Sequence, residues 1–233
     1  MQFILPLRSL AHVLTQGLRL PSPPRHALAA ALVAALVALL GACSAPAQRP
    51  AVYDFGPGQV PSSIPASLSS SQASLPPLLL ADIDASSALD GSAVLYRLLY
   101  ADAQQLRPYA QARWSMAPAQ LLRLRLRQQL GQRRSVLSPG DALAPGTLVL
   151  RLELEEFSQL FASAQTSSVL LRVRATLSRS PSKPLAQTSL VVQRPAASPD
   201  AAGGVQALAL ATDELTQQLD AWLQQAGAAE PAP

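Results

Sequence analysis

The feature that most constrains this chain is an apolar run, residues 27–40, that ends just before its only cysteine, Cys43. Three arginines precede the run, and no acidic residue occurs before Asp54. A basic flank, a short apolar segment and small residues at its exit are typical of a secretory signal peptide. Because a membrane-spanning helix needs about 20 apolar residues, a permanent transmembrane helix is the weaker interpretation. The sequence therefore predicts an exported protein.

The residues that close the run resemble the lipobox of bacterial lipoproteins: Leu40, Gly41, Ala42 and Cys43. This resemblance implies a signal peptide over residues 1–42, cleavage between Ala42 and Cys43, and acylation of Cys43. Two lipid signals already give stable anchoring, so the three chains of an acylated cysteine would hold the protein on a membrane. By analogy with lipoprotein sorting, Ser44 favours the periplasmic face of the outer membrane. An incidental cysteine in an ordinary export signal is the alternative.

Removal of the signal peptide would also remove both histidines, His12 and His26. Histidine-dependent acid–base catalysis, Ser-His-Asp and Cys-His arrangements, and zinc sites built from His or Cys all need residues that the remaining chain lacks. Three of the 18 basic residues and none of the 14 acidic ones lie in residues 1–42, which leaves a net charge of about +1. We therefore expect neither a cofactor nor a nucleic-acid partner.

Composition divides the rest of the chain into a tether, a domain and a tail. Residues 43–77 are rich in Pro, Ser and Ala, and such a segment cannot bury enough apolar surface to order itself. Within it, the aromatic pair of residues 53–55 predicts a short edge strand. The folded domain is expected over residues 78–225, and residues 226–233 read as a disordered tail.

Residue periodicity predicts an α+β fold in this domain. Strands are indicated by apolar runs or by alternation at residues 78–84, 92–100, 104–109, 147–157, 167–178 and 185–193. A helix is favoured over residues 118–130, with Pro118 in its first turn and Gly131 as its terminator, and a second helix over residues 204–225. The prediction is a single domain with a mostly antiparallel sheet and two main helices packed on one face.

Three side-chain clusters each allow two interpretations. The arginines of the first helix region could bind an anionic surface or, as we favour, form a solvated helix face: Arg123, Arg125, Arg127, Arg133 and Arg134. The carboxylates Glu153, Glu155 and Glu156 could serve acid–base chemistry, but a solvated strand is favoured. Aromatic side chains could line a lipid-contacting groove, whereas core packing with hydroxyls bonded to backbone is favoured: Tyr96, Tyr100, Tyr109 and Trp114.

The order of several motifs resembles that of the ABC-type transport auxiliary lipoproteins, from Cys43 to about Gln225. The matching residues are Tyr53 and Phe55, Tyr96 and Arg97, Tyr109, Trp114, Pro118, Leu152 to Leu154 with Phe157, and Trp222 with Leu223. Family members usually carry a second aromatic residue where this chain has Pro108. The resemblance implies a non-catalytic periplasmic subunit that works beside an MCE-domain protein and inner-membrane transporter components to move lipids. It implies a structural role for the motif residues.

Two rival functions remain from the residues alone. One is an assembly-factor lipoprotein that binds an outer-membrane β-barrel. The other is a hydrolase that uses Asp82, Asp84 or Glu153 without histidine, which is disfavoured because no activating partner is visible in the sequence. Phospholipid contact and assembly into a homo-oligomer are left open.

Overall fold

The computed structural model describes residues 49–57, 75–179 and 183–228. The predicted signal peptide, Ala42 and Cys43 lie outside these residues. The elements, in chain order, are β1 (Ala51–Tyr53), β2 (Leu75–Ala85), the 3-10 turn η1 (Ser87–Leu89), β3 (Ala93–Leu98), β4 (Asp102–Trp114), α2 (Pro118–Leu130), β5 (Arg134–Leu137), β6 (Leu148–Phe161), β7 (Ser167–Arg179), β8 (Lys183–Pro195) and α3 (Ala201–Ala228). None of the helices in the described part of the chain has the length and apolar character needed to cross a membrane.

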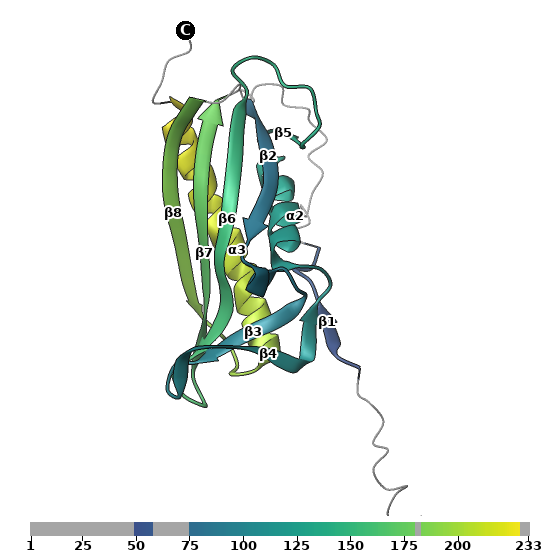
Figure 1. Ribbon diagram of the computed structural model, residues 1–233, viewed down its shortest axis with the longest axis vertical. Helices are drawn as coiled ribbons and strands as arrows, with labels where there is room; N and C mark the ends of the chain where they lie inside the picture. Colours follow the sequence, from purple (N-terminus) through teal and green to yellow (C-terminus); the bar gives the residue numbers. More distant parts are fainter. Residues whose placement is uncertain (1–48, 58–74, 180–182, 229–233) are drawn as a thin grey trace, which may run out of the picture. The chain divides into compact units, whose positions relative to one another are not determined.

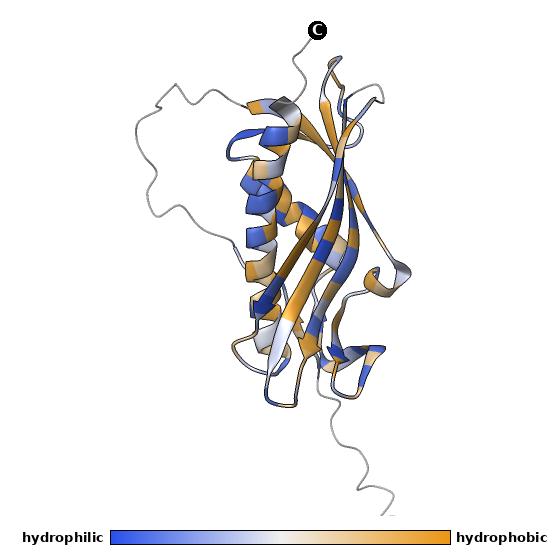
Figure 2. Cartoon of the chain, turned by 90° about the vertical axis from the view of Figure 1, so that its left-hand side faces the viewer, coloured by the Kyte–Doolittle hydropathy of each residue, from blue (hydrophilic) through white to orange (hydrophobic). Residues whose placement is uncertain are grey.

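The sheet is organised around β6, which pairs with three other strands. β7 runs antiparallel to its whole length, and β8 runs antiparallel to β7. On its other edge, β6 pairs in parallel with β2 along its first half and with β3 near its end. Figure 1 and Figure 2 show α2 and α3 on the same side of this sheet. The predicted α+β domain, mostly antiparallel and with both helices on one face, is confirmed.

A change of register divides β6 between its two partners. The shift lies between Leu154 and Glu156, next to the point where β2 ends its pairing with β6. One wing of the sheet, β2 and β5, lies before this shift, and the other wing, β3, β4 and β1, lies after it. A bulge of this kind lets one strand bend and serve two neighbours. The sequence did not predict this division.

The core lies between the sheet and the helices. The alternating leucines of β6 are all buried, as their pattern predicts: Leu148, Leu150, Leu152 and Leu154. α3 covers them with a buried stripe of Val205, Leu208, Leu215, Leu219 and Leu223. Each fully buried side chain of this size contributes about 1.5–3 kcal/mol relative to exposure. The stripe ends in Leu223, whereas Trp222, expected in the stripe, is only half-buried.

The first helix has the predicted boundaries because its signals are local. Pro118 occupies the first turn, where its missing N–H has no partner to lose, and Gly131 follows the last residue. Leu122, Leu126 and Leu130 are buried at four-residue spacing. The helical interpretation of this ambiguous Leu and Arg segment is therefore correct.

The second helix begins three residues before the predicted start because Asp200 caps it. The Asp200 carboxylate accepts hydrogen bonds from the N–H of Gly203 and from the hydroxyl of Ser198, both at 2.8 Å. These hydrogen bonds hold the pKa of Asp200 below its usual range. A side-chain oxygen that binds a free N–H of the first turn is the usual way to stabilise a helix start.

Candidate functional site

Residues 51–57, here called the strap, are held against the folded domain. β1 pairs in parallel with the end of β4, with Ala51 opposite Ala112 and Tyr53 opposite Trp114. The N–H of Ser115 continues this pairing by donating to the Tyr53 carbonyl oxygen at 2.7 Å. The short strand therefore comprises Ala51–Tyr53, two residues before the predicted position, and it lies at the edge of the sheet as expected.

The strap turns after its strand and inserts an aromatic ring. Gly56 has a φ of 68°, a conformation that favours glycine, and its N–H donates to the Asp54 carboxylate at 2.7 Å. This turn directs Phe55 to ring-centroid distances of 5.7 Å from Trp114 and 6.1 Å from Phe157. Trp114 and Phe157 are each 1% exposed. Such aromatic pairs contribute about 0.5–1.5 kcal/mol beyond the area that they bury.

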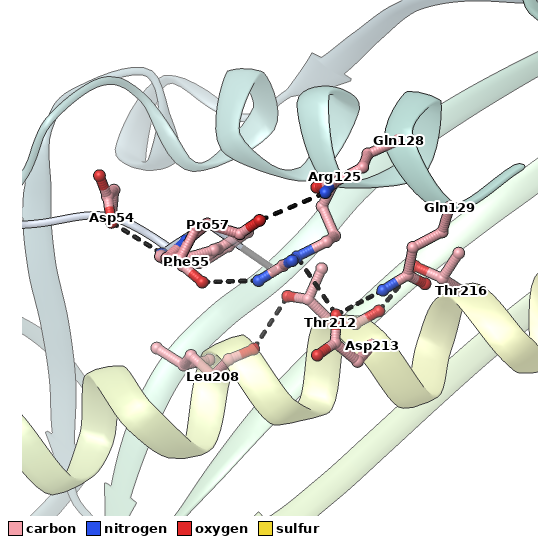
Figure 3. A network of polar contacts seen from close by, with 11 residues as sticks. Asp54, Phe55, Pro57, Arg125, Gln128, Gln129, Leu208, Thr212, Asp213 and Thr216 are labelled. Atoms are coloured by element: carbon pink, nitrogen blue, oxygen red, sulfur yellow. Dashed lines mark hydrogen bonds and ion pairs between the residues drawn. The ribbon is translucent and has the colours of Figure 1, made fainter. Parts of the chain in front are cut away.

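A buried arginine connects the strap to both helices. Arg125 of α2 donates from Nη2 to the Phe55 carbonyl oxygen at 2.6 Å, and its guanidinium carbon lies 6.0 Å from the centre of the Phe55 ring. Its Nε lies 3.2 Å from Oδ1 of Asp213 in α3, an ion pair without the alignment of a hydrogen bond. Gln129 also donates to this carboxylate oxygen, at 2.6 Å, and Gln128 donates to the Pro57 carbonyl oxygen at 3.3 Å. Figure 3 shows these contacts converging between α2 and α3.

A polar cleft lies beside Arg125, between α2 and α3. Its volume is about 270 Å³, and its walls include Arg125, Gln128, Gln129, Arg133, Asp213 and Asp220. Asp220 binds both Arg133 and Arg134, the latter at 2.8 Å. A second hollow of about 170 Å³ lies on the other side of Arg125, between the strap and the exposed Leu124. The contacts of Arg125 therefore hold the strap, α2 and α3 around two small hollows.

Each of the five arginines of this region has a polar partner within the chain, but their burial differs. Arg123 lies 2.6 Å from Asp82, and Arg127 donates to the Ser138 hydroxyl. Arg125 and Arg134 are buried. The expected solvated face is therefore wrong for Arg125 and Arg134, whereas Arg123 and Arg127 are half-buried and Arg133 is exposed. The sequence did not reveal this because the partners are distant along the chain.

A second aromatic cluster lies near the ends of β3 and β6. The rings of Tyr96 and Tyr109 are 4.6 Å apart, and Phe161 lies 5.8 Å from Tyr96. The Tyr109 hydroxyl donates to Oε1 of the buried Gln159 at 2.9 Å, and Gln159 donates to the Ser167 hydroxyl at 2.7 Å. Burial raises the pKa of Tyr109 well above its usual value, with further contributions from Tyr96 and Asp200.

These contacts correct part of the aromatic prediction. Tyr96, Tyr109 and Trp114 pack into the domain, but they form two clusters rather than one groove. The Tyr109 hydroxyl binds a side-chain amide, not the backbone as expected. Tyr100 is 54% exposed at the turn between β3 and β4, so its expected core position is wrong.

The acidic residues of β6 are paired with arginines across the sheet. Arg174 lies 2.6 Å from Glu155 and 3.7 Å from Glu153. Arg97 of the predicted motif lies 3.2 Å from Glu156 and donates to the Gln104 carbonyl oxygen at 3.0 Å. Glu153 is exposed, and Glu155 and Glu156 are half-buried, so these carboxylates lie on the partly solvated face of the strand. Among the described residues, no group of three His, Cys, Asp or Glu side chains is placed to hold a metal ion.

The remaining motif residues lie in structural positions. Tyr53 and Trp222 are half-buried against the core, Pro118 is buried at the start of α2, and Phe157 is buried beneath the strap. The sequence missed Asp213 and Gln159, which connect these parts, and it named Arg125 only as one member of an arginine cluster. The sequence held one signal for Arg125. This arginine follows Leu122 by three residues and so lies on the apolar face of the helix, where a cation needs a partner of opposite charge.

Comparison with known proteins supports the fold and the family. No curated protein matches the chain. A crystal structure of a Xanthomonas campestris protein of the family DUF330 is 18% identical, with a TM-score of 0.56, and the match covers 78% of this chain and 90% of that one. Another crystal structure, of an uncharacterized protein, is 12% identical with a TM-score of 0.55 and covers 75% and 99%. At these identities the likeness concerns the fold.

The family follows from a match to the sequence model of the "ABC-type transport auxiliary lipoprotein component", which extends over residues 59–220. The match begins after the strap and includes α2, most of α3, the β6–β7–β8 ladder and the cluster of Tyr96, Tyr109 and Phe161. Of the other aromatic cluster it includes Trp114 and Phe157 but not Phe55. It also includes most of the motif residues on which the resemblance was based, from Tyr96 to Phe157. The chain belongs to the family of ABC-type transport auxiliary lipoproteins.

Proposed function

We propose that this protein is a non-catalytic subunit of an ABC-type lipid transport system, anchored to the periplasmic face of the outer membrane through acylated Cys43. It works beside an MCE-domain protein and inner-membrane transporter components, and it acts through protein contacts. The observation that carries this proposal is the family match over residues 59–220, downstream of a lipobox that ends in Cys43.

The pairing of polar side chains supports a non-catalytic role. A general acid or base needs a carboxyl group free to exchange a proton with a substrate. Glu153, Glu155 and Glu156 are held by arginines, and Asp82 is held by Arg123. These groups therefore stabilise the sheet and the first helix.

The surfaces of the domain support a role in contact. The cleft between α2 and α3 has polar walls and is small, with a volume of about 270 Å³. Cavities that enclose a drug-sized ligand are mostly apolar and usually hold about 300–1,000 Å³. A small polar cleft suits the rim of a protein interface better than the enclosure of a lipid, and the exposed Leu124 lines the neighbouring hollow beside the strap.

The test is affinity purification of the tagged, acylated protein from gently solubilised envelopes, with mass spectrometry of the proteins and lipids that accompany it. We expect an MCE-domain protein and a transporter component. A matched Cys43→Ser variant, which lacks the acylated thiol, shows which partners need the anchor. Recovery of a β-barrel without any transport component would overturn the proposal. Bound phospholipid would add direct lipid contact, and cross-linking of the same sample reports whether several copies associate.

A further inference from the structure

The strap is placed between the predicted lipid anchor and the folded domain, and its contacts fix where the anchor chain leaves the domain. We propose that residues 51–57 clamp the anchor to the core, so that the β1 edge of the domain faces the phospholipid surface within about 28 Å. The inference rests on the proposed acylation of Cys43. It adds which surface meets the membrane and how far away the membrane lies.

The distance follows from the length of chain that remains outside the clamp. Only eight peptide units separate Cys43 from Ala51, the first residue of the strap. At about 3.3–3.6 Å for each residue, these units reach at most about 28 Å. If the strap were detached, the first strand to hold the chain would be β2, which begins at Leu75, and the contour from Cys43 would be at most roughly 110 Å. The strap therefore shortens the maximal reach about fourfold.

Three kinds of contact make the strap a clamp. The β1–β4 pairing holds its backbone, Phe55 packs against two buried rings, and the Phe55 carbonyl oxygen accepts a 2.6 Å hydrogen bond from buried Arg125. Hydrogen bonds from a charged donor are worth about 1.5–3 kcal/mol, and the aromatic contacts of the half-buried Phe55 ring add about 0.5–1.5 kcal/mol. Because these contacts are adjacent along the chain, release of the strap requires their loss together.

The reach is short compared with the domain. α3 has 28 residues, about 42 Å of helix, and β6 has 14 residues, about 46 Å of strand. An anchor chain of about 28 Å that leaves at Ala51 cannot bring the far ends of these elements to the membrane while β1 stays away from it. The surface around the start of β1 is therefore the part of the domain that approaches lipid.

The side chains at this surface suit phospholipid headgroups. Arg49 is exposed, Val52 is 62% exposed, and exposed Arg113 stands beside Val52 in the β1–β4 register. Cationic side chains near a membrane surface each contribute about 1 kcal/mol with anionic lipids. The acid of the strap, Asp54, already accepts the N–H of Gly56. The exit of the anchor chain thus combines two cations with an apolar side chain.

The test places the same flexible insertion on either side of the strap. A 20-residue Gly/Ser insertion between Cys43 and Arg49 lengthens the anchor chain whether or not the strap holds. The same insertion within residues 58–74 lengthens it only if the strap is detached. The acylated protein is reconstituted in phospholipid vesicles that contain a dansyl lipid, and energy transfer from Trp114, which packs on Phe55, is measured in a Trp222→Phe background.

We expect the first insertion to lower transfer about threefold, because it adds roughly 25 Å of coil, and the second to leave transfer unchanged. A Phe55→Ser variant, which weakens the clamp, should make the second insertion effective. Equal effects of the two insertions in the unmodified strap would overturn the proposal. Failure of acylation is recognised separately, because the protein then lacks the added mass at Cys43 and does not float with vesicles. In that case a maleimide lipid attached to the Cys43 thiol provides the anchor. The comparison of the two insertions then still tests whether the strap holds the chain.

Discussion

Replacement of Arg125 by methionine tests whether one buried charge holds the strap, α2 and α3 together. The arginine side chain is 5% exposed and lies 3.2 Å from Asp213, while methionine keeps much of its packing volume and removes the charge. Loss of one member of a buried ion pair costs about 3–5 kcal/mol, because the other charge stays unpaired. Asp213 is 29% exposed and keeps its 2.6 Å hydrogen bond from Gln129, so we expect a loss of about 2–3 kcal/mol.

Two further variants make this result interpretable. An Asp213→Leu change added to Arg125→Met removes the unpaired carboxylate, and we expect it to restore about 1–2 kcal/mol of the loss. Arg123→Met is the matched control on the same helix. Its pair with Asp82 is far more exposed, at 28% and 73% of the two side chains, so its loss should stay below about 1 kcal/mol.

The measurement is the free energy of unfolding from urea titrations followed by circular dichroism, with the slope of each transition compared among variants. An Arg125→Met loss no larger than that of Arg123→Met would refute the reasoning. Strictly additive effects of the Arg125 and Asp213 changes would also refute it, because additivity means that the two side chains do not interact.

Three other changes test the packing of the domain. A Gly204→Ala methyl group would enter the space of the buried Gln159 amide, so we expect a loss of about 1–3 kcal/mol in urea unfolding, and no loss would contradict this close approach. Asp200→Ala should cost about 1 kcal/mol at neutral pH. Since the folded-state pKa of Asp200 is lowered, the difference in unfolding free energy between the unmodified protein and Asp200→Ala should shrink as the pH falls below about 4 and through the folded-state pKa. Asp200→Asn should retain the cap. A difference that persists in acid would contradict the capping role. Phe157→Ala should cost about 3–5 kcal/mol and free the strap to proteolysis near Phe55, and a variant with an equally resistant strap would show that the ring does not support it.

Local signals predicted most of the fold. The alternating leucines of β6 define a half-buried strand, and Pro118 with Gly131 defines the ends of α2, because in each case the signal lies within the element itself. The strand β5 was not predicted, since Arg134–Leu137 is too short to show alternation and is recognised only by its pairing with β2. Parallel pairing of β2 with β6 was also missed, because their contact joins segments separated by a long excursion of the chain.

The candidate site was less accessible from the sequence than the fold. The sequence marked Trp114 and Phe157 as apolar, but it could not show that Phe55 packs on both. The sequence did not distinguish Arg125 from the other arginines of its cluster, although only Arg125 and Arg134 are buried, beside Asp213 and Asp220. Contacts such as Phe55 with Trp114 and Arg125 with Asp213 join elements that are distant along the chain. Periodicity in a single sequence indicates which residues are buried, but it does not indicate which of them meet.

The division of the sheet at β6 has a consequence for motion. The wing of β3, β4 and β1 joins β6 through a short ladder, Tyr96 to Leu98 opposite Gln159 to Phe161, whereas β7 pairs with β6 along its whole length. Cooperative units that share few hydrogen bonds with their surroundings open at lower free energy than the global transition. Amide protons of β3 and β4 should therefore exchange with solvent faster than those of β7, and the domain should open first on the side where the strap enters.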